Sequence, residues 1–201
     1  MPLNSFLGQD APNATPLSHD EVIGLIPTWI ATRQDLNLAE FSNINSAQSQ
    51  AKWRNLSTSK LLDDLQVRLL HKAMFGNVWT WAGQYRARNL NIGIDFVNVA
   101  LEVRNLLENA TYWFASNGGE QVEIDACILH HRLVSIHPFA NGNGRHARFF
   151  VDLILESKGL PPFTWGGAAL TDASENRSSY ISALKQADRG DISALLSFVR
   201  S

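Results

Sequence analysis

Two nearly all-apolar segments with a polar loop between them constrain the fold of this chain more than any other feature. The first covers about residues 122–136 and the second about residues 149–155. A helix that is apolar on almost every side must lie inside a fold rather than on its surface. With 201 residues, of which 45% are hydrophobic, the chain has enough apolar material for such a core. The sequence therefore predicts a helical fold built around these two segments.

Helical spacing of apolar residues and capping residues predict further helices on both sides of this pair. Asn37, followed by Glu40, resembles a helix cap with its partner, and Ser59 is a second candidate cap. Gly76 is a candidate stop signal. The expected helices cover about residues 20–26, 37–54, 59–75, 100–116, 174–189 and 191–199.

One segment departs from the helical pattern. Residues 78–99 combine Trp79, Trp81 and Tyr85 with short alternations that include Asn and Gly, which predicts a small β-hairpin. Arg86 and Arg88 would then either contact a substrate or lie on a solvated edge of the hairpin. The predicted fold class is all-α with one small hairpin. Residues 1–58 would form an N-terminal arm and helices that pack on a single compact core of residues 59–201.

Charge and composition exclude several classes of function. The net charge of −2 gives no general attraction to nucleic acid or to an anionic membrane. The first residues lack the basic and apolar regions of a secretory signal, and no run approaches ~18 apolar residues. Cys127 is the single cysteine, which excludes an internal disulfide and fits a reducing compartment. We therefore expect a cytoplasmic protein that binds neither nucleic acid nor membrane directly.

The loop between the two apolar segments, residues 137–148, has the composition of an anion-binding site. Buried backbone groups need hydrogen-bond partners, and a bound ligand can supply them. Gly142 and Gly144 allow a tight turn and a close approach of the backbone to a ligand. The next helix is expected to begin near Gly144, and its unpaired N–H groups would attract phosphate.

Three charged or titratable side chains extend this interpretation. Arg145 and Arg148 lie three residues apart on the expected helix and can both donate to a phosphate chain, while His137 is a candidate general base. Each has a simpler explanation as well: His137 alone is typical of a helix cap, and the arginines can pair with Asp152 or Glu156. Their combination within twelve residues favours phosphate chemistry. His130 and His131 lack the spacing of a zinc site and are expected to be packed or hydrogen-bonded.

This loop resembles the signature of the Fic (filamentation induced by cAMP) family, H-x-F-x-[DE]-G-N-G-R-x-x-R. Every fixed position except one is present, and the exception is Asn141 in place of Asp or Glu. Upstream of the loop, residues 75–83 and Arg86 also resemble the family. Downstream, Arg177, Tyr180, Gly190 and Asp191 do so, and the similarity covers roughly residues 60–200. Residues 10–17 and 25–33 resemble the Fic branch called mobile mystery protein B.

The resemblance implies an all-α Fic-type domain with a hairpin flap beside the active-site loop. It also implies a protein adenylyltransferase that moves AMP from ATP to a Ser, Thr or Tyr hydroxyl of a target protein, with His137 as the general base. The phosphates would be held by Gly142, Asn143 and Gly144, and neutralised by Arg145 and Arg148. Phe139 would anchor the loop in the core.

The departure at Asn141 leaves two alternatives open. The family residue at this position holds Mg²⁺, and an amide oxygen can replace it as a ligand but brings no charge. The chain would then use ATP with weakly held Mg²⁺. Alternatively, it is a degenerate or regulated Fic domain that binds a nucleotide or a partner, or it transfers a different phosphate-containing group.

The resemblance also implies partners. The target protein would dock by strand addition on the hairpin near Leu90–Val97. Many Fic proteins are inhibited by a glutamate in [ST]-x-x-x-E-[GN], which pairs with the second motif arginine. Residues 171–176 match this pattern and make Glu175 a candidate partner of Arg148. Since the N-terminal helix has no such match, an inhibitory antitoxin or helix-turn-helix protein is the other candidate inhibitor.

Overall fold

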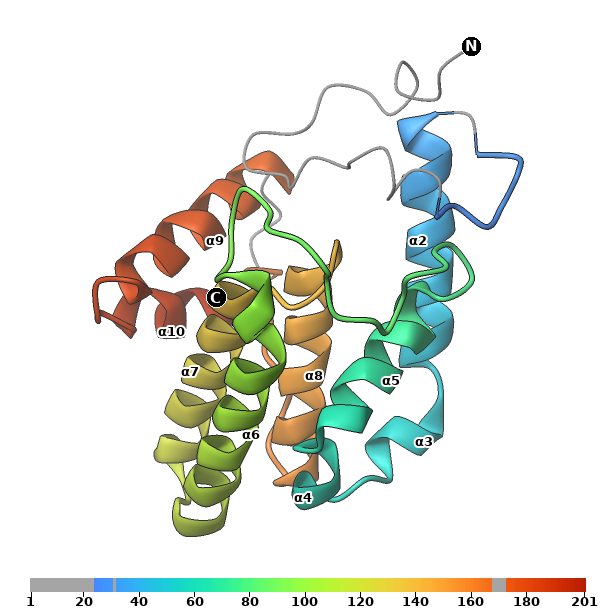
Figure 1. Cartoon of the computed structure of the whole chain (residues 1–201). Coiled ribbons are helices and arrows are strands. Elements are labelled where there is room, and N and C mark those ends of the chain that lie inside the picture. The colour runs from blue at the N-terminus through green and yellow to red at the C-terminus, as the bar shows by residue number, and fades with distance from the viewer. Residues whose placement is uncertain (1–23, 31, 168–172) are drawn as a thin grey trace.

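The computed structural model describes residues 24–30, 32–167 and 173–201, and it describes side chains in the last range from residue 177 onward (Figure 1). This part of the chain is mostly helical, as predicted. A single β-bridge joins Leu25 to Trp79 within these ranges. The elements are α2 (Arg33–Gln48), α3 (Ala51–Arg54), α4 (Thr58–Leu61), α5 (Asp64–Phe75), the 3₁₀ turn η2 (Phe96–Asn98), α6 (Val99–Ser116), α7 (Glu120–Ile136), α8 (Asn143–Ser157), α9 (Ala173–Ala187) and α10 (Ser193–Val199).

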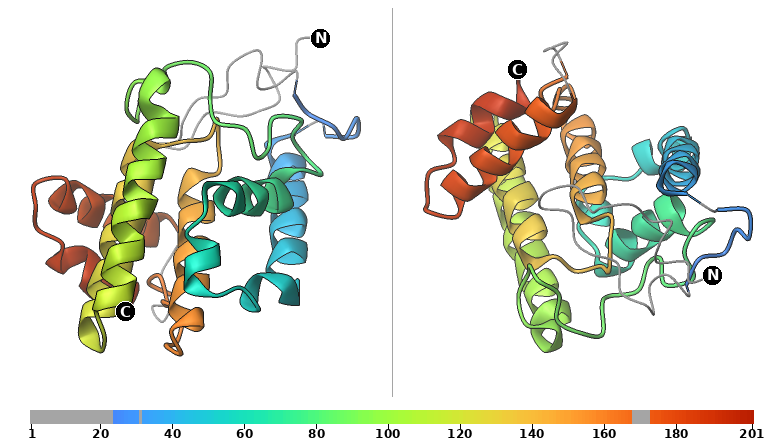
Figure 2. Two further views of the ribbon diagram at one scale, coloured as in Figure 1. Left: turned by 60° about the horizontal axis from the view of Figure 1, so that its bottom comes forward. Right: turned by 90° about the horizontal axis from the view of Figure 1, so that it is seen from above.

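Helices α7 and α8 pack against each other and form the centre of the fold, as their apolar composition predicts. Helix α6 packs against one face of α7, and α10, with α9 beside it, packs against another; α5 and then α2 lie on the far side of α8 (Figures 1 and 2). Phe150, Val151 and Ile154 of α8 are completely buried. None of the helices in the described ranges is long and apolar enough to cross a membrane.

The start of the N-terminal helix was predicted wrongly. Helix α2 begins at Arg33 rather than Asn37, because Thr32 and Asp35 form a reciprocal capping box with distances of 3.1 and 2.9 Å. Asn37 is an exposed residue inside the helix, and Glu40, expected as its capping partner, is buried instead. The predicted helix 37–54 is also divided, since Ser49 ends α2 before α3 begins.

The helix predicted over residues 59–75 was correct at its C-terminal end only. The segment after Ser59 forms two helices, and the longer one, α5, is capped by Asp63, whose carboxylate accepts from the N–H of Leu65 at 2.8 Å. Gly76 ends α5, as expected, with its N–H donating to the carbonyl of Lys72 at 2.7 Å. The expected helix over residues 20–26 falls largely outside the described residues, and residues 24–26 within it form a turn and the bridge to Trp79.

The predicted hairpin is not formed in residues 78–99. Residues 88–97, called the flap segment below, run as an irregular loop into η2 and α6. The carbonyls of Arg88 and Ile94 accept hydrogen bonds from the guanidinium of Arg86, so a side chain satisfies them instead of a second strand. Arg86 is buried, so the expected position on a solvated hairpin edge is wrong.

A buried amide holds α2 against α5. Asn43 of α2 donates from Nδ2 to the carbonyl of Ala73 at 2.9 Å and accepts at Oδ1 from the N–H of Asn77 at 2.9 Å. The first partner is in the last turn of α5 and the second follows its C-terminal cap. This contact explains how a helix as polar as α2 is fixed to the core.

Replacing Asn43 with Ala is expected to destabilise the fold, since it removes a buried amide that bonds to the carbonyl of Ala73 and the N–H of Asn77. The expected loss is ~2–4 kcal/mol in the free energy of unfolding, measured by urea denaturation. Asn45→Ala is the control, because Asn45 is exposed on the same helix and should cost under ~0.5 kcal/mol. Equal losses in both variants would contradict the anchoring role of Asn43.

Candidate active site

His137 is placed where α7 ends and the polar loop begins. It caps the helix in the left-handed backbone conformation, with φ 54° and ψ 62°, which is uncommon for a residue other than glycine. The side chain is only 8% exposed. Burial lowers the pKa of His137 to about 4, an effect that Arg86 strengthens and the carbonyl of Val134 opposes. At neutral pH the imidazole is therefore uncharged and able to accept a proton.

The loop after His137 is held by its own asparagine. Asn143, 3% exposed, accepts at Oδ1 from the N–H of Phe139 and donates from Nδ2 to the carbonyl of Phe139, both at 2.8 Å. Both polar atoms of the Asn143 side chain are thus used inside the loop. The amide side chain therefore fixes the conformation of the loop. Phe139 is completely buried, as expected of an anchor.

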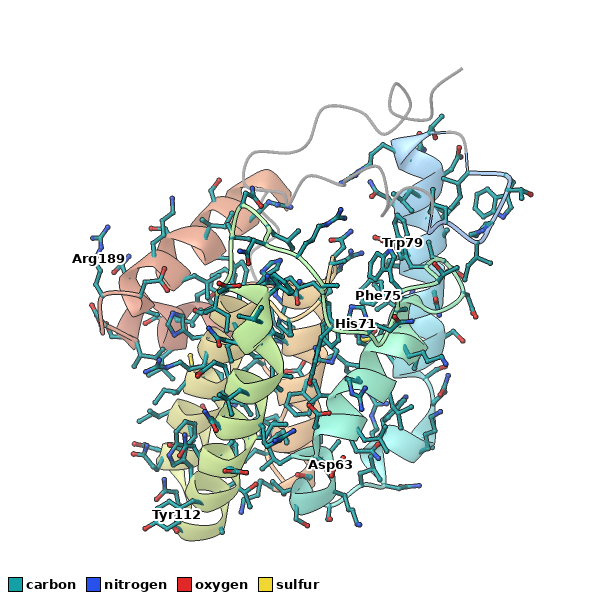
Figure 3. All side chains as sticks on the ribbon, in the orientation of Figure 1. Asp63, His71, Phe75, Trp79, Tyr112 and Arg189 are labelled. Carbon is teal, nitrogen blue, oxygen red and sulfur yellow. The ribbon has the colours of Figure 1, made fainter. Side chains whose placement is uncertain are left out.

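His71 of α5 is a second support of the loop. Its Nδ1 accepts from the N–H of Gly83 at 3.0 Å, so its Nε2 carries the proton and donates to the carbonyl of Asn141 at 3.0 Å. The ring stacks on Phe139 with centroids 3.7 Å apart. Burial holds the pKa of His71 well below its ordinary value. In the sequence, the sign of this role is a histidine on the apolar face of α5. Figure 3 shows its side chain beside Phe75.

The backbone that follows forms the N-terminus of α8, where the glycines predict an anion site. Helix α8 begins at Asn143, one residue before the predicted start, and its N-cap Gly142 has no side chain that could cap it. Gly142 has φ 77°, and a Cβ there would lie 2.4–2.9 Å from ring atoms of Phe75. A Cβ at Gly144 would meet only the hydroxyl of Tyr180, at 3.8 Å. Glycine at 142 is thus required by packing, whereas Gly144 leaves open space at the N-terminus of α8.

Arg145 is paired with a carboxylate that the sequence did not reveal. Its Nη1 lies 2.7 Å from Oε2 of Glu40, which is 3% exposed and also accepts from Nε1 of Trp79 at 2.7 Å. The guanidinium lies 4.9 Å from the ring centroid of Phe75. The Arg145 side chain remains 42% exposed. Glu40 comes from α2, so the N-terminal helix contributes directly to the site.

Arg148 has a different environment. Its guanidinium carbon lies 4.2 Å from the ring centroid of Tyr180 and 5.5 Å from that of Trp165. Trp165 is held in turn by the carboxylate of Asp152, and burial raises the pKa of Asp152 to about 6. Glu156 pairs with Arg54 rather than with a motif arginine. The alternative pairing of Arg145 and Arg148 with Asp152 and Glu156 is therefore not observed.

Asn141 does not form a ready metal site. Its Oδ1 accepts from the N–H of Gly142 at 2.7 Å, and its carbonyl is the acceptor for His71. Within the described ranges no group of three His, Cys, Asp or Glu side chains is placed to hold a metal ion. The protein residues described at this site thus do not fit a dedicated Mg²⁺ site.

The remaining predicted residues are accounted for as follows. The side chain of Glu175 lies outside the described residues, although its backbone belongs to α9. The flap segment is largely exposed and includes the apolar residues Ile92, Phe96 and Val97. His130 bonds to Tyr180 and His131 to Asp188, both at 2.8 Å, as their sequence context predicts.

Comparisons with known proteins match this geometry. The family model described as Fic/DOC family matches residues 61–155. Protein adenylyltransferase Fic of Nematostella vectensis is 31% identical over 193 residues, which are 94% of this chain and 39% of that protein. Protein adenylyltransferase fic-1 of Caenorhabditis elegans is 27% identical over 96% of this chain and 34% of its own length. The chain thus spans less than half the length of these relatives.

A solved structure shows how far the likeness of fold extends. BepC of Bartonella tribocorum, solved with bound AMPPNP, aligns with a TM-score of 0.67 over 91% of this chain and 97% of that chain, at 16% identity. The shared fold therefore includes helices on both sides of the matched segment. Together with the loop geometry, these matches show that the chain contains a domain of the Fic/DOC family.

Proposed function

We propose that the chain is a protein adenylyltransferase that transfers AMP from ATP to a Ser, Thr or Tyr hydroxyl of a target protein. The observation that carries the proposal is the placement of a neutral, buried histidine directly before the uncapped N-terminus of α8. A proton acceptor and a phosphate-binding backbone are thereby joined by one short loop. The printed names of the Nematostella and Caenorhabditis relatives, and the ATP analogue in the Bartonella structure, support the same reaction.

In the proposed reaction the hydroxyl oxygen of the target attacks the α-phosphorus of ATP. His137 accepts the hydroxyl proton as the new P–O bond forms. The bond from the α-phosphorus to the oxygen bridging to the β-phosphorus breaks, and pyrophosphate leaves. The backbone N–H groups at the start of α8 hold the phosphates, and Arg145 and Arg148 neutralise the leaving group. The contribution of the protein is positioning and charge stabilisation, as in phosphoryl transfer generally.

Mg²⁺ is proposed to arrive with ATP rather than on a site of the protein. The oxygens of Asn141 are engaged with Gly142 and His71, so they are poorly available as ligands. No step of the proposed mechanism depends on a protein-bound metal.

The proposed partners rest on the sequence and on exposed surface. The target protein would dock along the flap segment, where Ile92, Phe96 and Val97 are exposed. Residues 10–17 and 25–33 support membership of the mobile mystery protein B branch. The resemblance to that branch supports a helix-turn-helix antitoxin as an inhibitory partner.

A second candidate function, a nucleotide-binding domain without turnover, is favoured by one contact. Glu40 already neutralises Arg145, which the adenylyltransferase reaction requires for the phosphates. In this alternative Glu40, rather than Glu175, restrains a motif arginine. The two functions differ in whether label is transferred when ATP binds.

Incubation of the protein with ATP labelled at the α-phosphate, Mg²⁺ and cell extract is expected to label a target protein. His137→Ala should lower the labelling rate by ~10²–10⁴-fold, because the hydroxyl loses its proton acceptor. ATP binding, measured by calorimetry, should be retained.

His131→Ala is the matched control, since His131 is also on α7 but bonds to Asp188 away from the loop. Equal labelling by His137→Ala and the unaltered protein would refute the role of the base. ATP binding without any labelling would instead support the second candidate function.

Glu40→Gln is expected to increase ATP affinity and labelling by about tenfold, since a charged hydrogen bond of Arg145 becomes available to phosphate. Glutamine keeps an acceptor for Trp79, so the buried contact is conserved. Glu123→Gln is the control, because it removes a similar ion pair, with Arg200, away from the loop. Weaker ATP binding by Glu40→Gln would show that Glu40 orients Arg145 for phosphate and does not restrain it.

Asn141→Asp is expected to lower the Mg²⁺ concentration needed for half-maximal labelling, because it adds a charged oxygen ligand beside the phosphate site. Labelling would be measured across a Mg²⁺ titration. Asn45→Asp, on the exposed face of α2, adds the same charge elsewhere and should leave the titration unchanged. An unaltered Mg²⁺ requirement in Asn141→Asp would place residue 141 away from the metal.

A further inference from the structure

Arg86 is a buried cation at the end of α7. The residue is 5% exposed, and its Nε donates to the carbonyl of His137 at 2.7 Å. Its Nη2 also approaches the carbonyl of Ile136, at 3.4 Å. The last carbonyls of a helix carry partial negative charge and have no partners within the helix. The guanidinium therefore occupies a site where a positive charge with several donors is favoured.

The same guanidinium holds the flap segment. Its Nη1 donates to the carbonyl of Arg88 at 2.9 Å, and its Nη2 donates to the carbonyl of Ile94. Two backbone hydrogen bonds accompany these contacts. The N–H of Arg86 donates to the carbonyl of Pro138 at 2.9 Å, and the N–H of Ile94 donates to the carbonyl of Ile136 at 3.4 Å. One side chain thus connects Arg88 and Ile94 of the flap segment to the carbonyls of Ile136 and His137.

Gly93 brings the flap segment into direct contact with the catalytic residue. A Cβ at this position would lie 2.7 Å from the Cβ of His137 and 3.0 Å from Nη2 of Arg86. The backbone φ of Gly93 is 95°, a conformation that favours glycine. No other residue type fits between the flap and His137 without displacing one of them.

Only arginine has the geometry for this arrangement. Its planar guanidinium offers five N–H donors in fixed directions, whereas the single ammonium of lysine could not reach carbonyls on both the flap and α7. A buried cation is costly unless its donors are satisfied, so the four carbonyls and the guanidinium stabilise one another. Loss of the side chain would leave the flap segment joined to α7 through the backbone hydrogen bond from Ile94 to Ile136.

We propose that Arg86 is a positioning residue that fixes the flap segment, and with it the target hydroxyl, at a set distance from His137. This inference rests on the proposed function, in which a segment of the target lies along the flap. The reaction requires the hydroxyl oxygen, the α-phosphorus and the imidazole to be aligned, and a displacement of ~1 Å can reduce a rate by ~10²-fold. Arg86 sets one side of this alignment and does not touch ATP.

The charge of Arg86 has a second effect on the same residue. Together with burial it lowers the pKa of His137, and among the described charged groups it is the one that contributes to this shift. Loss of the charge should raise the pKa of His137 toward its ordinary value. The acid side of the pH–rate profile, where protonation removes the base, would then move to higher pH.

Two substitutions separate the effect of the Arg86 hydrogen bonds from the effect of its charge. Arg86→Lys keeps the charge and loses the shared contacts, so the KM for the labelled target protein should rise and kcat fall, together lowering kcat/KM by ~10²-fold. ATP affinity should change by less than about twofold, because Arg86 is outside the phosphate site. Arg86→Gln should show the same loss and, in addition, the shift of the acid limb to higher pH. Arg132→Gln removes an exposed positive charge from α7 and should change neither property.

Two readouts are independent of AMP transfer. Titration of the His137 imidazole by NMR should give a higher pKa in Arg86→Gln than in the unaltered protein and in Arg86→Lys. Hydrogen exchange should be faster in residues 88–95 of both Arg86 variants. If these changes occur while no protein is labelled by any form of the chain, the proposed reaction fails and the structural role of Arg86 stands.

Gly93→Ala is a second route to the same test if the Arg86 variants do not fold. Its added methyl group should displace the flap from His137 and lower kcat/KM for the target while ATP affinity is kept. The proposal is overturned if either folded variant weakens ATP binding as much as target labelling. It is also overturned if Arg86→Lys transfers AMP at the rate of the unaltered protein with unchanged hydrogen exchange.

Discussion

A polar loop inside an apolar core must have its backbone groups satisfied, and the rest of the site depends on how this chain meets that requirement. The amide of Asn143 closes the loop on Phe139, and the imidazole of His71 accepts from Gly83 and donates to Asn141. The guanidinium of Arg86 donates a hydrogen bond to the carbonyl of His137. With these side chains serving the loop, the N–H groups at the start of α8 are the ones proposed to bind phosphate. Hydrogen bonds from three side chains thus fix the backbone of the loop before α8 begins.

The two motif arginines are chemically alike but are held in different ways. Arg145 faces a buried carboxylate, which competes with any phosphate for the same donors. Arg148 lies against the rings of Tyr180 and Trp165, which orient a cation without neutralising it. A phosphate chain that enters the site would therefore meet one cation paired with a carboxylate and one packed on aromatic rings. A phosphate that binds Arg145 would have to replace Glu40 as its partner.

Local sequence patterns predicted those parts of the fold that local interactions decide. Apolar periodicity located α6, α7 and α8, and Gly76 marked the end of α5. The start of α2 was misplaced because two plausible caps lie within a few residues, and only Thr32 has a partner in capping position. The hairpin was mispredicted because alternation of residue types does not reveal that Arg86 satisfies the carbonyls of the loop. Glu40 and His71 were missed for the same reason, since their partners are far away in the sequence.

The packing of Phe75 against Gly142 has a consequence for how this sequence can vary. The ring fills the space where a side chain at position 142 would lie, and its face also receives the guanidinium of Arg145. A larger residue at 142 would need a smaller one at 75, but that change would remove the ring beneath the arginine. A single substitution at position 75 or 142 therefore changes both the turn before α8 and the surface on which Arg145 lies.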